Sequence, residues 1–125
     1  MKSNKELVTA FAKTWNNLDS SFIRDLLDPD FHYASQWVLD EIKNKEDYLS
    51  YLDKKLQAIS NSGTRLIAEL GEHENKYCLV LNQIQNGRAN KVTFLIETKN
   101  GKLLRADTCM IPDPKEIKML NIIPK

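Results

Sequence analysis

Two Asn-Gly pairs, at residues 86–87 and 100–101, interrupt a part of the chain in which apolar and polar residues alternate. Asn-Gly is the most favourable pair for a two-residue β-hairpin turn, because both residues tolerate positive φ angles. The chain on either side of each pair therefore predicts antiparallel strands joined by tight turns. We expect four such strands, over residues 64–74, 76–85, 90–99 and 102–111.

Helical periodicity precedes these strands. Residues 4–17 carry apolar side chains at spacings of three and four, which predicts a helix with one buried face made of Leu7, Val8, Phe11, Ala12 and Trp15. Another helix is expected over residues 45–60, with Asn44 as its N-cap. Its inward face should comprise Tyr48, Tyr51 or Leu52, Leu56 and Ile59.

The segment between these two helices predicts a short helix and then a strand. The short helix would start at Asp19 or Ser20 and end before Pro29, because the residue before a proline avoids the helical region. Its inward side chains would be Phe22, Ile23, Leu26 and Leu27. In the strand that follows, DPDFHYASQWV (residues 28–38), alternation places one set of side chains together: Phe31, Tyr33, Ser35 and Trp37.

Helices followed by a meander of long strands are typical of the α+β class. We therefore expect residues 1–125 to form a single domain in which N-terminal helices pack on a curved, mostly antiparallel sheet. The course of residues 113–125 is left open, although this tail is apolar enough to pack against the domain.

Two-residue turns also predict the register of the strands. Lys99 should pair with Lys102, which sets Thr93 opposite Thr108. In the preceding hairpin Gln85 should pair with Arg88, which sets Val80 opposite Thr93. One face would then carry Cys78, Val80, Asn82, Thr93, Leu95, Ala106, Thr108 and Met110. The other would carry Tyr77, Leu79, Leu81, Val92, Phe94, Ile96, Arg105, Asp107 and Cys109. A longer loop at either turn would exchange the faces of a strand.

Two expectations follow from these faces. Cys78 and Cys109 would lie on opposite sides of the sheet, so no disulfide is expected between them. Both faces are substantially apolar although the helices can cover only one, and a large exposed apolar patch usually marks an interface. We therefore expect a homodimer formed through the outer face of the sheet.

Composition narrows the range of partners. The 125 residues are 42% apolar and 28% charged with a net charge of +1, a balance that argues against a nucleic-acid-binding protein. No apolar run approaches the length that spans a membrane, and the first residues lack the apolar core of a signal peptide. The two cysteines are too few for a disulfide scaffold. A cytoplasmic protein is expected.

Motifs for a cofactor, a metal or a nucleophile are weak. With four glycines, the chain has no glycine-rich phosphate loop, and no cofactor is expected. His73 lies between Glu72 and Glu74, but neighbouring strand residues project to different sides, so no metal site is expected. Asp40 and Glu41 follow the aromatic strand, and Glu97 would share the concave side of the sheet with Thr93. Asp40 and Glu97 are the candidate acids or bases, each with a simpler interpretation as a solvated residue.

Aromatic residues give the strongest functional signal. Four of them could converge beside a few hydroxyl and amide groups, as in small-molecule pockets with apolar walls and placed polar groups. The alternative is that the rings fill the core and leave no cavity. The candidate ligand-binding residues are Trp15, Tyr33, Ser35, Trp37, Tyr51, Asn82, Thr93 and Thr108.

The order of elements resembles the nuclear transport factor 2-like superfamily, which includes SnoaL-like polyketide cyclases and ketosteroid isomerases. The segments that carry the resemblance are AFAKTWNNLDSSFIRDLLDPDFHYAS, NKEDYLSYL and VTFLIETKNGKLLRADTCM. The resemblance covers nearly the whole chain, and it is a signature of fold rather than of catalysis. It implies a cone-shaped domain with an apolar pocket between helices and concave sheet, often in a dimer.

The isomerase chemistry does not carry over with the resemblance. That mechanism needs an Asp base, with a Tyr and a protonated Asp as oxyanion donors. The corresponding positions of this chain are Ser35, Phe11 and Thr93, respectively. A serine hydroxyl cannot remove a carbon-bound proton unaided near neutral pH, and a phenylalanine donates no hydrogen bond.

Three functions remain open. The first is a dimeric domain that binds a small, largely apolar molecule without catalysis. The second is a SnoaL-like isomerase, cyclase or hydrolase-type enzyme that uses an unusual acid such as Asp40 or Glu97. The third is an interaction or immunity-type module that binds another protein through the outer face of the sheet.

Overall fold

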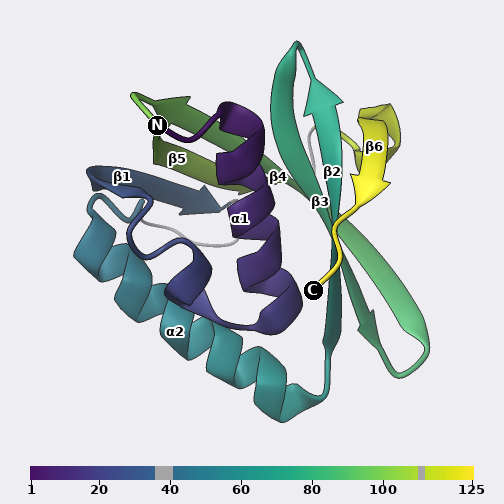
Figure 1. Ribbon diagram of the computed structural model, residues 1–125. Coiled ribbons are helices and arrows are strands. Elements are labelled where there is room, and N and C mark those ends of the chain that lie inside the picture. Colours follow the sequence, from purple (N-terminus) through teal and green to yellow (C-terminus); the bar gives the residue numbers. More distant parts are fainter. Residues whose placement is uncertain (36–40, 110–111) are drawn as a thin grey trace.

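The computed structural model describes residues 1–35, 41–109 and 112–125. It has two α-helices, two 3₁₀ turns and one six-stranded sheet with the strand order β1-β5-β4-β3-β2-β6. The helices are α1 (Asn4–Asn17) and α2 (Lys45–Ser62), and both lie on the same side of the curved sheet (Figure 1). The strands are β1 (Leu27–Ser35), β2 (Arg65–His73), β3 (Lys76–Gln85), β4 (Arg88–Lys99), β5 (Lys102–Cys109) and β6 (Lys118–Ile122).

This architecture confirms the α+β class and the mostly antiparallel sheet, with β1 and β5 as the parallel pair. Both long helices have their expected positions and faces. A capping box opens α1, because Ser3 and Glu6 each accept a hydrogen bond from the backbone N–H of the other. Asn44 caps α2 by accepting from the backbone N–H of Asp47. No described helix is long and apolar enough to cross a membrane.

The expected short helix before β1 is largely wrong. Only a 3₁₀ turn forms, over Ser20–Phe22, with Asp19 as its N-cap. Phe22 is 38% exposed rather than buried. Pro29 does not end a helix but lies inside β1, an edge strand, where a missing backbone N–H is tolerated.

Both Asn-Gly turns form as expected. All four residues, Asn86, Gly87, Asn100 and Gly101, have positive φ angles between 52° and 77°. This is the geometry of a type I′ turn, whose twist matches that of the flanking strands. The predicted pairing of β3 with β4 is confirmed, with Val80 opposite Thr93 and Cys78 opposite Leu95.

The pairing of β4 with β5 differs from the prediction by one residue. Lys99 pairs with Lys102 as expected, but a bulge between Glu97 and Thr98 shifts the rest of the register. Thr93 therefore lies opposite Cys109, and the predicted pairing of Thr93 with Thr108 is wrong. The shift exchanges the faces of β5. Arg105, Asp107 and Cys109 therefore share the outer face with Thr93 and Leu95, while Ala106 and Thr108 share the helix-covered face with Phe94 and Ile96.

The bulge has a clear energetic reason. Strict alternation would place Arg105 and Asp107 on the same face as Phe94 and Ile96, inside the core. Burying charged groups there would be costly. The bulge keeps Leu103 and Ala106 fully buried, and it leaves Arg105 and Asp107 half-exposed and paired with each other. It also places Cys109 on the same face as Cys78, contrary to expectation, although no disulfide joins the two.

The C-terminal tail covers part of the outer face. After a 3₁₀ turn (Pro114–Glu116), Ile117 packs against Cys78, Val80 and Leu95, and β6 then pairs with the edge of β2. Cys78 and Val80 are only 1% exposed as a result. The premise of the predicted dimer, an uncovered apolar outer face, is therefore wrong over this area. The homodimer itself remains a prediction.

Aromatic rings fill one part of the space between helices and sheet. The rings of Phe11, Phe31, Tyr48 and Phe94 are completely buried. They meet in tilted and edge-to-face contacts, with centroid distances of 4.7 Å for Phe31 and Tyr48 and 4.9 Å for Phe11 and Phe94. Such geometries favour aromatic pairs beyond the area they bury. The expectation of a core filled with rings holds for this part of the domain.

Candidate functional site

A cavity of about 470 Å³ remains beside the aromatic core, between α2 and the helix-covered face of the sheet. This volume is in the range of small-molecule sites. Every element of the fold except β6 and the 3₁₀ turns contributes to its walls. The residues that line it are Trp15, Tyr33, Ser35, Tyr51, Lys55, Ile59, Leu66, Leu81, Gln83, Asn90, Val92 and Thr108.

Hydroxyl groups gather where β1 and β5 end side by side. The parallel pairing of these strands sets Ser35 beside Thr108 and Tyr33 beside Ala106. The hydroxyls of Tyr33 and Thr108 are hydrogen-bonded, with their oxygens 2.9 Å apart. The ring of Tyr51 packs against that of Tyr33, with a centroid distance of 5.4 Å. This end of the cavity therefore offers several neutral hydroxyls to a ligand.

Burial keeps the phenol of Tyr33 protonated. It raises the pKa of Tyr33 to about 12, an effect that the hydrogen bond to Thr108 only partly offsets. The hydroxyl of Tyr33 is therefore neutral at physiological pH. It can donate or accept a hydrogen bond, and it is a poor base.

Two buried polar groups near the cavity have no partner among the described protein atoms. The indole N–H of Trp15, a lining residue, is one, and the hydroxyl of Tyr48, behind Tyr33 and Tyr51, is the other. Burial raises the pKa of Tyr48 well above its ordinary value. An unpaired buried donor costs free energy, so these groups are not there to stabilise the fold.

The opposite end of the cavity is apolar and leads to a polar rim. Ile59, Leu66, Leu81 and Val92 form the apolar walls. Lys55, Gln83 and Asn90 are the polar lining residues outside the hydroxyl cluster, and both Lys55 and Asn90 are exposed.

The structure brings together five of the eight residues that the sequence indicated. Trp15, Tyr33, Ser35, Tyr51 and Thr108 all line the cavity. Asn82 and Thr93 do not. They belong to the outer face, where the hydroxyl of Thr93 donates to the backbone carbonyl of Pro112. The expected convergence of these two residues on the pocket is wrong. Trp37 lies outside the described residues.

Sequence reasoning missed the other seven lining residues. Lys55 and Ile59 follow Tyr51 at intervals of four along α2, so the face that the helix presents to the cavity could have been found from this spacing. Leu81 and Val92 were assigned to the outer face because Asn82 and Thr93 were assigned to the pocket. The signal that would have corrected this is a conflict within one predicted face. That face combined the charged Arg105 and Asp107 with strongly apolar residues of the two preceding strands, which indicates a break in the register.

Of the candidate acids, the structure describes Glu97, which does not line the cavity. Glu97 is exposed and pairs across the sheet with Arg105 on the outer side, so its expected place on the concave side is wrong. Asp40 lies outside the described residues. On the outer face, the carboxylate of Glu41 forms an ion pair with Arg105. Oε1 of Glu41 also lies 3.5 Å from Nδ1 of His32. Within the described ranges, no three Asp, Glu, His or Cys side chains gather into a group that could hold a metal ion.

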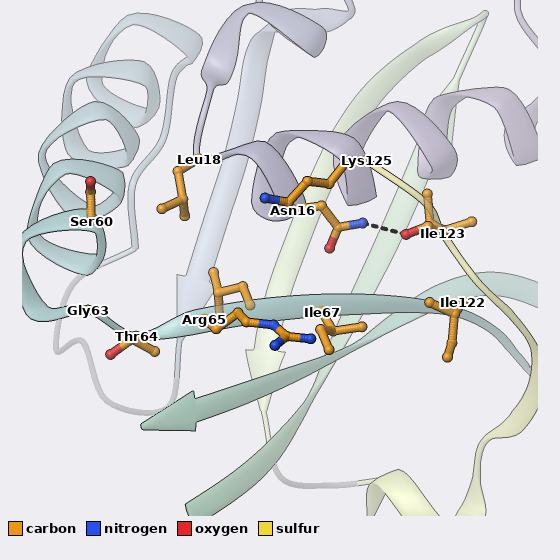
Figure 2. Close-up of a pocket in the computed structure, with 11 residues that line it drawn as sticks. Asn16, Leu18, Ser60, Gly63, Thr64, Arg65, Ile67, Ile122, Ile123 and Lys125 are labelled. Atoms are coloured by element: carbon orange, nitrogen blue, oxygen red, sulfur yellow. Dashed lines mark hydrogen bonds between the residues drawn. The ribbon is translucent and has the colours of Figure 1, made fainter. Parts of the chain in front are cut away.

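A second cavity, of about 540 Å³, lies where the C-terminal tail crosses the start of β2 (Figure 2). It is a more open depression, and Ile122 at its edge is 62% exposed. The buried Asn16 links its walls. Asn16 donates to the carbonyl of Ile123 and accepts from the backbone N–H of Ala68, both at 2.7 Å. None of the residues indicated by the sequence lines this depression, and the amide of Asn16 in its wall serves to hold the tail.

Comparison with known proteins identifies the fold. No protein-family model matches the chain, and no curated protein matches it. Several solved structures do match the chain. One is a nuclear transport factor 2-like protein of unknown function from Cytophaga hutchinsonii, with a TM-score of 0.63 at 16% identity. The match covers 86% of this chain and 89% of that one. An uncharacterised cystatin-fold protein from Novosphingobium aromaticivorans has a TM-score of 0.65 at 15% identity, over 86% and 98%.

A candidate polyketide cyclase from Sinorhizobium meliloti is also similar, with a TM-score of 0.63 at 12% identity, over 86% of this chain and 99% of that one. Identities this low show the fold and not the activity. The expected resemblance in fold is therefore confirmed: the chain has the nuclear transport factor 2-like, cystatin-like fold.

Proposed function

We propose that this domain, with its nuclear transport factor 2-like fold, binds a small and largely apolar molecule in the cavity between α2 and the sheet. The observation that carries the proposal is the lining itself. Aliphatic and indole side chains form the walls, and the hydroxyls of Tyr33, Ser35, Tyr51 and Thr108 gather at one end. Apolar walls with a few placed polar groups are what small-molecule sites have in common.

Binding is supported over acid–base catalysis by the groups available. None of the described lining residues is an aspartate, a glutamate or a histidine. Tyr33, with its pKa raised to about 12, is suited to orient a carbonyl or hydroxyl of the ligand by hydrogen bonding. The similarity to a candidate polyketide cyclase is one of fold, and it brings no catalytic group to this cavity.

The proposal is tested with 8-anilinonaphthalene-1-sulfonate, a fluorescent probe with an apolar aromatic body. The variant Ile59→Trp fills the cavity from α2 at a half-buried position. We expect it to weaken probe binding by about tenfold or more, since the larger ring occupies the space of the probe. The matched control is Ile84→Trp, because Ile84 is also half-buried but lies on the outer side of β3.

Circular dichroism and thermal unfolding establish that both variants are folded. Loss of probe binding in Ile59→Trp but not in Ile84→Trp supports the proposal. Equal binding by both variants and the wild type would show that the probe binds elsewhere, and it would refute the proposal.

A further inference from the structure

We infer that the molecule bound in this cavity is an amphipathic organic anion, whose apolar body enters the cavity and whose acidic group binds Lys55 at the rim. The inference rests on the proposed function, because it specifies the ligand of that same site. It is carried by the position of Lys55, by the absence of an opposing charge among the lining residues that the structure describes, and by the uncharged polar groups around it.

Lys55 lies at the mouth of the cavity on the lining face of α2. Tyr51, Lys55 and Ile59 are four residues apart, so one helix face presents a phenol, an ammonium and an aliphatic side chain in sequence along the cavity. The ammonium nitrogen lies 5.8 Å from the centroid of the Tyr51 ring. A cation at this distance from a ring face is attracted to it, which favours a position of the ammonium beside the opening.

No carboxylate of the described chain neutralises this ammonium. Lys55 is the single charged residue among the described residues that line the cavity, and it makes no salt bridge within the described ranges. Asp53, a close acid on the same helix, is already engaged by Arg24 at 3.1 Å and by the hydroxyl of Ser20. The charge of Lys55 therefore remains free to attract an anion.

The other side of the mouth adds no negative charge. Gln83 and Asn90, from β3 and β4, line it with neutral amides that can donate hydrogen bonds to an oxyanion. An adjoining depression shares these two residues and is lined also by Arg88. The described mouth is therefore positive or neutral, which favours an anionic ligand and disfavours a cationic one.

The test compares two probes that differ in one charged group. 8-Anilinonaphthalene-1-sulfonate and N-phenyl-1-naphthylamine share the same aromatic body, and only the first carries a sulfonate. Both are titrated into the wild-type protein, Lys55→Met and the control Lys54→Met. Lys54 is an exposed neighbour on α2 that does not line the cavity, so the control removes the same charge from the same helix.

We expect Lys55→Met to weaken binding of the sulfonate probe by about five- to tenfold and to change binding of the neutral probe by less than about twofold. Lys54→Met should leave both affinities within about twofold of the wild type, since its charge is farther from the site. The affinity of the wild type for the sulfonate probe should also fall with added salt more steeply than that of Lys55→Met.

The outcomes separate this inference from the proposed function. If Lys55→Met weakens both probes equally, or neither, while Ile59→Trp still abolishes binding, the cavity binds its ligand without an acidic group at Lys55 and the inference is overturned. If Ile59→Trp weakens the binding of neither probe relative to the wild type, the proposed function fails, and the inference fails with it.

Discussion

Tyr33 and Tyr48 pack against each other at the edge of the cavity, with ring centroids 5.1 Å apart, but their hydroxyls differ. The hydroxyl of Tyr33 is bonded to Thr108, whereas that of Tyr48 is buried without a partner among the described protein atoms. A buried hydroxyl stabilises a fold when it is bonded and destabilises it when it is not. The two residues therefore make opposite contributions to stability through the same chemical group.

We expect Tyr48→Phe to raise the free energy of unfolding by about 1 kcal/mol, because it removes an unpaired buried hydroxyl and keeps the ring. Tyr33→Phe should lower it by about 1 kcal/mol, since it removes the hydrogen bond to Thr108. Urea denaturation of the two variants measures both changes. A loss of stability in Tyr48→Phe similar to that in Tyr33→Phe would contradict this account.

Asn16 is a second residue whose polar group has a defined structural task. Its buried amide connects α1 to Ile123 in the tail (Figure 2). The same amide also accepts from the backbone N–H of Ala68 in β2. Asn16→Ala would leave a buried N–H and a buried C=O unpaired, so we expect a loss of about 3 kcal/mol in the free energy of unfolding.

The matched control for this variant is Asn17→Ala. Asn17 is the next residue of α1, and its amide donates only to the carbonyl of Lys13 in the same helix. Its loss should cost about 0.5 kcal/mol, which is typical of a substitution away from buried networks. Chemical denaturation compares the two, and similar losses would show that the bonds of Asn16 do not hold the tail.

At the scale of single elements, the sequence predicted what is encoded locally. The Asn-Gly turns were predictable because a preference for positive φ belongs to the two residues that make the turn. Helices α1 and α2 were predictable because their apolar stripes and caps lie within the helices themselves. The strand β6 was not, because KMLNI becomes a strand only by pairing with the distant β2.

The bulge at Glu97 and Thr98 shows why the site was only partly predicted. Turn geometry gives a register close to the turn, and nothing local in KLLRADTC requires an extra residue. The bulge is favoured by the whole sheet, because it keeps Arg105 and Asp107 out of the core. Residues on helices and on β1 were therefore placed correctly, whereas Asn82 and Thr93 were assigned to the wrong face.

The contact between β2 and the tail depends on a glycine. A Cβ atom at Gly71 would lie 2.5 Å from Cγ2 of Ile117, which is closer than two carbons can approach. We expect Gly71→Ala to displace Ile117 and to cost about 1–2 kcal/mol of stability. In the Ile117→Ala background the same substitution should cost less, because the clashing atom is gone. A double-mutant cycle by urea denaturation measures the difference, and additive losses would contradict the proposed contact.

The reactivity of the Cys78 thiol measures how firmly the C-terminal tail packs on the outer face of the sheet. The thiol lies under Ile117, and burial raises its pKa to about 11, so it should react slowly with a thiol reagent near neutral pH. With Cys109→Ser as the background, Gly71→Ala should speed its modification by about tenfold or more, because the tail then opens more often. An unchanged rate would show that the tail does not protect this face.

At the scale of the whole molecule, the order of helices and strands was enough to predict the fold, since helix and strand periods and the hairpin turns agree with one another. It was not enough to predict function, because many unrelated activities share one fold. The cavity depends on which side chains of seven elements meet, and only tertiary packing decides that. The central claim therefore concerns the cavity between α2 and the sheet.

The most direct test of that claim is a two-dimensional amide NMR titration of the protein with 8-anilinonaphthalene-1-sulfonate. We predict saturable shift changes concentrated at the lining residues of β1, α2, β3 and β5, including Tyr33, Tyr51, Leu81 and Thr108. Changes concentrated instead around the open depression at Ile122, or spread evenly over the surface, would contradict the assignment of this cavity as the binding site.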